Sequence, residues 1–337
     1  MEKEPSHHAS VPEFMRTTDV ATCPVCGCAG NKQYEHLIDR ATIVAGVWGS
    51  RKCNNLACEA YWLDPMPVAE DLHKAYASYY THGNGKCSRR RPAKREEMAL
   101  QIIRTIESLW LRALFLAPER EGLETMFLAN LPPGRVLEVG CGAGALLRRL
   151  RDLGWTVEGQ DVDPNAASIA DNDIVVHLGD LRALALPSES YDAVVMNHVI
   201  EHVHYPVALL RECHRLAKPG GILVITTPNA ESYGHRIFRD AWRGLEPPRH
   251  LHLFTSKSLE FIASKSGWVT YRNFTCVSRS GDMLAISRNI KRTGFHKMGG
   301  RKSLVHLISA AWYQFAARLN HVRRPGSGEE IVLIARK

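Results

Sequence analysis

Three glycines at alternate positions follow a short apolar run that contains a carboxylate. The run is Val136-Leu137-Glu138-Val139, and Gly140, Gly142 and Gly144 come next, before an apolar and basic helical pattern. This order predicts a strand, a tight turn and a helix. Glycine suits such a turn because a Cβ hinders both positive φ and the close approach of backbone to a ligand. The turn is a candidate ligand site, with an ordinary strand-to-helix connection as the alternative.

Two more carboxylates follow the next predicted strands. Asp161 ends the second strand, and Asp180 follows the third. A dinucleotide fold also has an acid after its second strand, but its Gly-x-Gly-x-x-Gly turn receives a pyrophosphate, which Glu138 would repel. The three acids instead favour a cationic ligand that carries hydroxyl groups and an amino group. S-adenosylmethionine has these features.

Two cysteine pairs near the N-terminus have the spacing of metal ligands. Cys23 and Cys26 form a Cys-x2-Cys pair followed by glycine, and Cys53 and Cys58 form a wider Cys-x4-Cys pair. Four thiolates complete a tetrahedral Zn²⁺ shell and leave no open position for chemistry, so we expect a structural role. Cys28 is a fifth candidate ligand, and a reduced, metal-free hairpin is the alternative.

Alternating strand and helix patterns supply the elements that must position the glycine turn and its acids. Strands are expected at 136–139, 156–160, 174–177, 191–197 and 222–227, and an edge pair at 268–276 and 330–336. This alternation predicts an α/β fold with a doubly wound, mostly parallel sheet. Its ligands should lie at the carboxyl ends of the strands.

The chain divides into four expected parts. They are a disordered tail at 1–18, a zinc-ribbon-like module at 19–66, a linker and helical cap at 67–131, and an α/β domain at 132–337 with a basic helical insertion at about 288–325. Within them we expect a short strand at 43–48 and cap helices at 96–116 and 121–131. The N-terminus lacks the pattern of a signal peptide and the nine cysteines suit a reducing compartment, so we expect a cytoplasmic protein.

Residues from about 130 to 230 resemble a class I S-adenosylmethionine-dependent methyltransferase. The stretches LEVGCGAG, GQDVD, GDL, YDAVV and LAKPGG match that family's motifs in order. The resemblance implies a Rossmann-like sheet and S-adenosylmethionine as the methyl donor. It also implies a set of cofactor-binding residues: Glu138, Gly140, Cys141, Gly142, Gly144, Asp161, Val162, Asp180, Leu181, Asn197 and His198. Among these we interpret Cys141 as a small filler of the turn.

The whole chain is also similar to methyltransferases with an N-terminal zinc-binding module, several of which act on sugars or on polyketide-like and cell-envelope precursors. Ubiquinone-pathway O-methyltransferases are similar through Glu201-His202-Val203, but they often have an acid where this chain has His198. We therefore expect methyl transfer to O or C of a small-molecule, sugar or lipid-linked acceptor. A hydroxyl acceptor needs a base, for which His252, His250 and His202 are candidates, with a structural role as the alternative.

The positive charge is concentrated near the C-terminus. The net charge of the chain is +8, and residues 279–337 contain twelve Lys/Arg against three acids. A basic, amphipathic helix is expected at 301–324, either as a lid on the sheet or as a contact with an anionic membrane. Two other functions stay open: an RNA methyltransferase whose zinc module and basic tail hold RNA, and a scaffold that binds the cofactor without catalysis.

Overall fold

The computed structural model describes residues 15–41, 44–76, 94–296 and 303–337. Most of the tail expected at 1–18 lies outside these residues. Within the described part of the chain, no helix is both long and apolar enough to cross a membrane.

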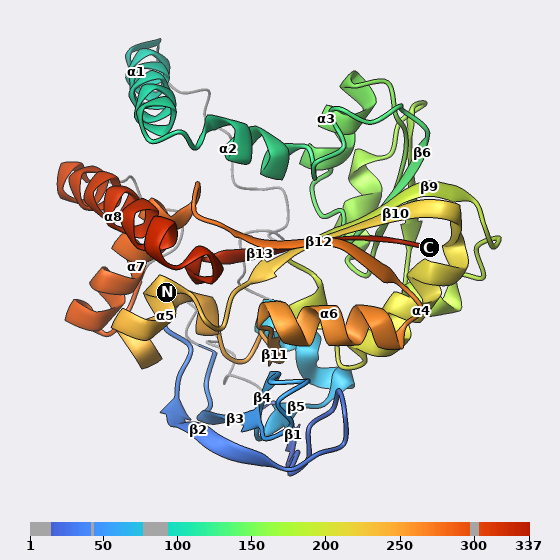
Figure 1. Ribbon diagram of the computed structural model, residues 1–337, viewed down its shortest axis with the longest axis horizontal. Helices are drawn as coiled ribbons and strands as arrows, with labels where there is room; N and C mark the ends of the chain where they lie inside the picture. The colour runs from blue at the N-terminus through green and yellow to red at the C-terminus, as the bar shows by residue number, and fades with distance from the viewer. Residues whose placement is uncertain (1–14, 42–43, 77–93, 297–302) are drawn as a thin grey trace, which may run out of the picture.

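A seven-stranded sheet forms the centre of the molecule (Figure 1). Its strands, in spatial order, are β12 (Val269–Cys276), β13 (Glu330–Arg336), β10 (Ala217–Pro228), β9 (Tyr191–Asn197), β6 (Arg135–Val139), β7 (Thr156–Asp161) and β8 (Ile174–Leu178). The strands from β10 to β8 run parallel, whereas β13 is antiparallel to both β10 and β12. The predicted parallel sheet and its antiparallel edge pair are confirmed.

Helices cover both faces of this sheet. The α-helices are α1 (Lys94–Ala113), α2 (Ala117–Glu124), α3 (Ala145–Asp152), α4 (Pro206–Leu216), α5 (Tyr233–Phe238), α6 (Ser256–Lys265), α7 (Ser280–Thr293) and α8 (Leu304–Arg323). In β10, Leu223 and Ile225 belong to the core that includes α4 and α6, whereas Val224 belongs to the core with α2 and α3. This alternation follows from the two-residue period of a strand.

Short 3₁₀ helices connect several of these elements. They are η1 (Ala69–Tyr76), η2 (Pro164–Ile169), η3 (Leu181–Ala183), η4 (Ile200–His202), η5 (Arg239–Ala241), η6 (Arg243–Leu245) and η7 (Pro325–Ser327). Of these, η4 carries Glu201 and His202 to the carboxyl end of β9. The segment 243–250, which begins with η6, brings His250 to the same region.

One cap prediction needs correction, while the basic helix forms as α8 after the N-cap Ser303. The second cap helix, expected at 121–131, is α2 at Ala117–Glu124. A proline lies in the first turn of α2, and Met126 and Phe127 just after its end have positive φ. Left-handed residues cannot continue a right-handed helix, so the sequence between 125 and 131 turns instead.

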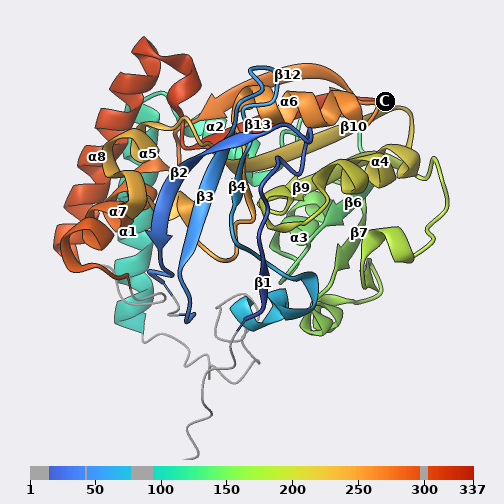
Figure 2. The same cartoon turned by 90° about the horizontal axis from the view of Figure 1, so that it is seen from below.

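The N-terminal module is a second, four-stranded sheet in the order β11 (His252–Leu253), β4 (Tyr61–Leu63), β3 (Trp48–Cys53) and β2 (Gly30–Leu37). A separate small pairing joins β1 (Thr17–Thr18) to β5 (Met66–Pro67). The strand expected at 43–48 is wrong, because β3 begins at Trp48 and β2 precedes it. Figure 2 shows β2, β3 and β4 side by side across the main domain. The strand β11 comes from the α/β domain, so the two parts of the chain share one sheet.

Candidate active site and metal centre

The glycine turn connects β6 to α3 at the carboxyl edge of the sheet. Gly140, Gly142 and Gly144 have φ values of +71°, +48° and +67°. A Cβ at Gly140 would lie 2.5 Å from Val199 Cγ2, and one at Gly144 would lie 2.5 Å from Ile169 Cδ1. A Cβ at Gly142 would meet no atom within 4 Å. The first and third glycines therefore allow close packing, whereas the second keeps a space open.

That space belongs to a cavity of about 2010 Å³. Pockets for drug-sized ligands have volumes of about 300–1,000 Å³, so this cavity has room for a cofactor and a second molecule. The predicted cofactor residues that line it are Gly140, Gly142, Asp161, Val162, Asp180, Leu181, Asn197 and His198. Glu138, Cys141 and Gly144 are buried just behind it.

The acids near the turn make its end of the cavity electronegative. Asp161 Oδ2 accepts a hydrogen bond from Gly142 N at 2.7 Å, which fixes the carboxylate against the turn. Glu138 is buried, and its Oε2 has no hydrogen-bond partner. Burial, and secondarily the charge of Asp161, raises the pKa of Glu138 well above its usual value. A buried carboxyl oxygen without a partner, beside a fixed carboxylate, suits the cationic ligand predicted for this turn.

Two further residues of the predicted cofactor set have distinct surroundings. The Cys141 thiol lies against Gly159, where an added Cβ would come 2.6 Å from the sulfur. Burial raises the pKa of Cys141 to about 12, so the thiol stays protonated at neutral pH. Asp180 is exposed and pairs with Arg182 at 2.6 Å. Arg182 also lines the cavity, and sequence reasoning did not identify it.

His198 is fixed between two carboxylates. Its Nδ1 lies 3.2 Å from Glu201 Oε1, and its Nε2 lies 2.7 Å from Glu330 Oε1. Burial opposes a charge on the ring, but the hydrogen bonds to the two carboxylates outweigh it and raise the pKa of His198 to about 10. The residue also has a φ of +57°, which is uncommon for residues other than glycine. His198 is therefore a protonated, tightly held side chain at neutral pH.

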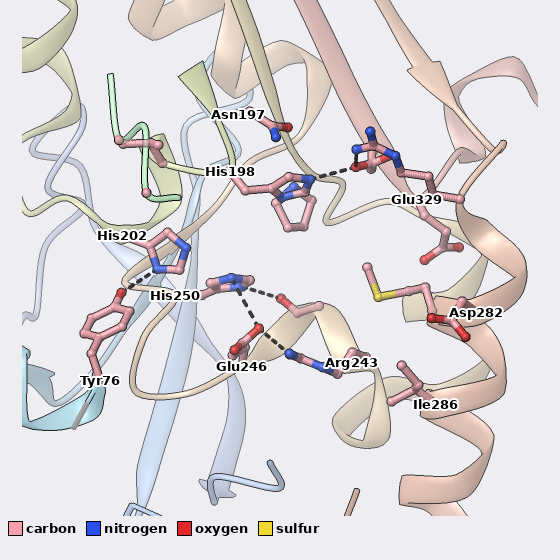
Figure 3. Close-up of a pocket in the computed structure, with 18 of the residues that line it drawn as sticks. Tyr76, Asn197, His198, His202, Arg243, Glu246, His250, Asp282, Ile286 and Glu329 are labelled. Atoms are coloured by element: carbon pink, nitrogen blue, oxygen red, sulfur yellow. Dashed lines mark hydrogen bonds and ion pairs between the residues drawn. The ribbon is translucent and has the colours of Figure 1, made fainter. Parts of the chain in front are cut away.

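Two of the three candidate bases, His202 and His250, lie close together in the cavity (Figure 3). The rings of His202 and His250 are 4.7 Å apart, and both residues line the cavity. His202 Nδ1 contacts Tyr76 Oη at 2.9 Å and the Arg249 carbonyl at 3.0 Å. Because a carbonyl only accepts, this contact assigns the hydrogen to Nδ1 and the lone pair to Nε2. In Figure 3 that second nitrogen of His202 points toward the cavity.

His250 and His252 have different surroundings although they are close in sequence. His250 Nδ1 donates to the Gly244 carbonyl at 2.7 Å. Burial, and secondarily the neighbouring His202, lowers the pKa of His250 to about 4, so the ring is neutral. His252 lies in β11, where it is buried opposite Trp62 and is not among the residues that line the cavity. The structure thus brings together His202 and His250 but not His252.

The loop that carries His250 is held by a buried ion pair with the N-terminal module. Arg249 is fully buried, and its guanidinium donates to both oxygens of Asp39 at 2.9 and 3.1 Å. Its Nε donates to Glu246 Oε1 at 3.0 Å. Sequence reasoning missed these three residues. Asp39 and Arg249 are 210 positions apart, so no local pattern could pair them.

Two groups of side chains among the described residues have the geometry of metal ligands. In one, a carboxylate oxygen of Glu201 and ring nitrogens of His202 and His250 lie within 4.8 Å of one another. In the other, the four predicted cysteines, Cys23, Cys26, Cys53 and Cys58, meet within the same limit. Cys28 is outside this group, and its Sγ faces the Cys26 carbonyl at 4.0 Å.

The four thiols match the size of a zinc site. The Sγ atoms of Cys23 and Cys58 are 3.8 Å apart, and those of Cys26 and Cys53 are 3.4 Å apart. A tetrahedral Zn²⁺ with bonds of about 2.3 Å requires sulfurs about 3.8 Å from one another. Hydrogen bonding from the Cys58 thiol lowers the pKa of Cys23 to about 5, which favours a thiolate there. The donor set therefore fits Zn²⁺.

Comparison with known proteins agrees with this geometry. Residues 111–272 match the family model described as a methyltransferase domain. The ubiquinone biosynthesis O-methyltransferase of Paraburkholderia xenovorans is 34% identical over 109 residues, which are 30% of this chain and 47% of that protein. The malonyl-[acyl-carrier protein] O-methyltransferase of Serratia marcescens is 29% identical over 170 residues, which are 48% of this chain and 64% of that protein. The chain thus spans about half the length of the ubiquinone-pathway relatives that it matches.

A solved methyltransferase structure from Mesorhizobium loti aligns with 66% of this chain and 100% of its own, at 18% identity and a TM-score of 0.44. The family assignment rests on the methyltransferase-domain match at 111–272, together with the glycine turn and the acids at the strand ends. Residues 111–272 of this chain are thus similar to the methyltransferase domain of class I S-adenosylmethionine-dependent enzymes.

Proposed function

We propose that this protein transfers a methyl group from S-adenosylmethionine to an oxygen of a small-molecule, sugar or lipid-linked acceptor. The observation that carries the proposal is the single cavity that joins the glycine turn to the His202–His250 pair. One end of the cavity suits the cationic cofactor, and the other end offers a base. The O-methyltransferase names of the relatives support oxygen as the acceptor atom.

The bound cofactor supplies an electrophilic methyl group on a sulfonium. The chain's part is to align the acceptor with that methyl group and to remove the hydroxyl proton. His202 Nε2 takes this proton, because Nδ1 is fixed by Tyr76 and the Arg249 carbonyl. Gly142, Asp161 and the other residues around the glycine turn would hold the cofactor, whose sulfonium would give its methyl group to the acceptor oxygen and become a thioether. Neutral His250 borders the same space without adding a charge.

We propose that Zn²⁺ at the four cysteines is structural. The ion would be held by four thiolates, which fill the shell of a closed site. It would connect the turn around Gly27 to the strand β3, whose last residue is Cys53. The module would then present Asp39 to Arg249 and β4 to β11.

The test is a transfer assay with cofactor labelled in its methyl group. Purified protein is incubated with small-molecule, lipid and RNA fractions, and the labelled product is identified by mass spectrometry and NMR. We expect an O-methyl product in the small-molecule or lipid fraction. Label in RNA would contradict the proposal, as would tight cofactor binding with no transfer to any fraction. A contact of 301–324 with an anionic membrane stays a prediction.

Substitution of His202 tests the base. His202→Gln should lower kcat by about 10²- to 10⁴-fold, the usual contribution of general base catalysis, and leave cofactor affinity unchanged. His214→Gln is the matched control, because His214 is a histidine in α4 away from the cavity lining. Turnover at the wild-type rate in both His202→Gln and His250→Gln would remove the proposed base.

A further inference from the structure

Six of the described arginines line the cavity, and four of them have a carboxylate partner. These four pairs are Arg120 with Glu107, Arg182 with Asp180, Arg243 with Glu246, and Arg279 with Glu330. The other two, Arg288 and Arg292, form no ion pair with any residue that the structure describes. Arg288 makes only a long contact, from Nη1 to Ser309 Oγ at 3.5 Å. These two guanidinium groups therefore bring positive charge to the cavity without a counter-ion.

Both arginines lie in the second half of α7. They are four residues apart, so their side chains project from the same face of the helix. The first half of this face carries Asp282, Met283 and Ile286, which also line the cavity (Figure 3). Since a helix rises by about 1.5 Å per residue, the two arginines follow Asp282 by about 9–15 Å along α7. The α7 wall thus has a partly apolar first half and a cationic end.

The glycine-turn end of the cavity has the opposite charge. The Asp161 carboxylate accepts a hydrogen bond from Gly142 N and forms no ion pair with any described residue. Anions are repelled by such an end and attracted to the cationic end of α7. The charge distribution of the cavity therefore suits two different ligands, a cation at the glycine turn and an anion at α7.

We propose that Arg288 and Arg292 bind a phosphate group of the methyl acceptor. The planar guanidinium group of arginine matches the oxygens of phosphate and can donate two parallel hydrogen bonds to them. A phosphate monoester carries a charge of about −1.5 to −2 at pH 7, which two guanidinium groups balance more closely than they balance a single carboxylate. His296 also lines the cavity, and burial lowers its pKa, so its neutral ring offers a hydrogen-bond donor without further charge.

This site narrows the class of acceptor to an elongated molecule that carries a phosphate group. Its less polar part would lie along Met283 and Ile286, and its reacting hydroxyl group would lie near His202. A soluble phosphate ester and the phosphate of a lipid-linked precursor present the same group to the arginines. The assignment to the acceptor rests on the proposed methyl transfer, whereas anion binding at α7 does not.

Binding of phenyl phosphate to the full chain tests the anion site. The protein is first saturated with S-adenosylhomocysteine, and binding is followed by phosphorus NMR. We expect a Kd on the order of 1 mM for the wild type. Arg288→Gln/Arg292→Gln should raise this Kd by about tenfold or more, because both charged donors are lost. Uncharged phenol should not distinguish the double variant from the wild type.

The matched control is Lys291→Gln/Arg323→Gln. It removes the same charge from two exposed side chains that do not line the cavity, so its affinity for phenyl phosphate should equal that of the wild type. Unchanged melting temperature and S-adenosylhomocysteine affinity show that both double variants are folded. Equal affinity for phenyl phosphate in the two double variants would overturn the proposal. Absence of saturable binding to the wild type up to about 10 mM would also overturn it.

The labelled product of the transfer assay tests the assignment to the acceptor. We expect mass spectrometry to find phosphorus in the methylated product. Recovery of that product in the aqueous phase identifies a soluble phosphate ester, and recovery in the organic phase identifies a lipid-linked phosphate. A methylated product without phosphate would overturn the assignment. Absence of label from every fraction would contradict the proposed function instead, and phenyl phosphate binding would still decide the anion site.

Discussion

At the residue scale, the open space over Gly142 is the feature that most favours the proposed cofactor site. Gly142 and Gly220 both have positive φ, and at both an added Cβ would meet no atom within 4 Å. They differ in place, because Gly142 lines the cavity whereas Gly220 lies near the start of β10, outside the cavity lining. Substitutions at these two glycines can therefore separate the cost of backbone strain from the loss of ligand contact.

We predict that Gly142→Ala and Gly220→Ala each lower the free energy of unfolding by about 1–2 kcal/mol, the cost of a left-handed alanine. Only Gly142→Ala should also weaken S-adenosylmethionine binding, by about tenfold or more, because its methyl group enters the cofactor space. Calorimetric titration and chemical denaturation measure the two effects. Equal cofactor affinity in the two variants would show that the cofactor does not approach Gly142.

His198 gives a pH dependence whose sign is fixed by its raised pKa. The pKa of His198 is raised from an ordinary 6.5 to about 10 by Glu201 and Glu330 against the effect of burial. Its stabilising contribution is therefore complete below pH 6.5 and is lost as the pH rises toward 10. His198→Asn removes the charge and keeps a residue that tolerates positive φ.

We predict that wild type is more stable than His198→Asn at pH 6, and that this difference shrinks steadily between pH 7 and pH 10. Chemical denaturation at several pH values measures the difference. A gap that stays constant over this range would mean that His198 is not protonated in the folded protein.

At the scale of elements, the Arg249–Asp39 pair joins the N-terminal module to the loop that carries His250. Both side chains are almost completely inaccessible to solvent, at 0% and 1% exposure. Removal of one partner from a buried pair leaves an uncompensated charge and costs about 3–5 kcal/mol. The surface pair Arg40–Asp240 is the natural comparison, because Asp240 is 58% exposed.

We predict that Asp39→Asn lowers the free energy of unfolding by about 3–5 kcal/mol, whereas Asp240→Asn changes it by about 0–1 kcal/mol. Asp39→Asn should also reduce kcat more than it weakens cofactor binding, since Arg249 supports the His202 ring through its carbonyl. Equal stability loss in both variants would show that the buried pair does not hold the module.

At the scale of the whole molecule, the N-terminal module and the methyltransferase domain share the sheet that contains β11 and β4. Loss of the metal should therefore affect the acceptor side of the cavity before the cofactor side. The cofactor side is built from β6, β7 and the glycine turn, which belong to the central sheet. Metal removal should therefore impair methyl transfer to the acceptor while cofactor binding persists.

We predict that Cys53→Ser loses the stoichiometric zinc and most of the methyl transfer but keeps measurable cofactor binding. Cys28→Ser should keep all three, because Cys28 lies outside the four-thiol group. Elemental analysis and calorimetric titration give the measurements. Full zinc content in Cys53→Ser would show that this thiol is not a ligand.

The sequence by itself determined the glycine turn and the strand-end acids that line one end of the cavity. The glycine turn, Asp161 and Asp180 are local features of consecutive strand ends, and parallel strands bring such ends to one edge of the sheet. The cysteine group could also be predicted from the sequence, because the spacing of metal ligands is a short-range pattern. The strand at 43–48 and the extent of α2 were wrong, since residues with positive φ follow the end of α2 and antiparallel pairing with β2 sets where β3 begins.

Only the tertiary structure decided which candidate bases line the cavity. His250 and His252 are two residues apart in one loop, yet one lines the cavity and the other lies buried in β11. The placement of Arg249 depends on Asp39, which no local pattern connects to it. The sequence shows that α1 and α8 each have an apolar face, but it does not show what covers these faces. Local periodicity tells which side of an element is apolar, but the partner of that side depends on how the whole chain packs.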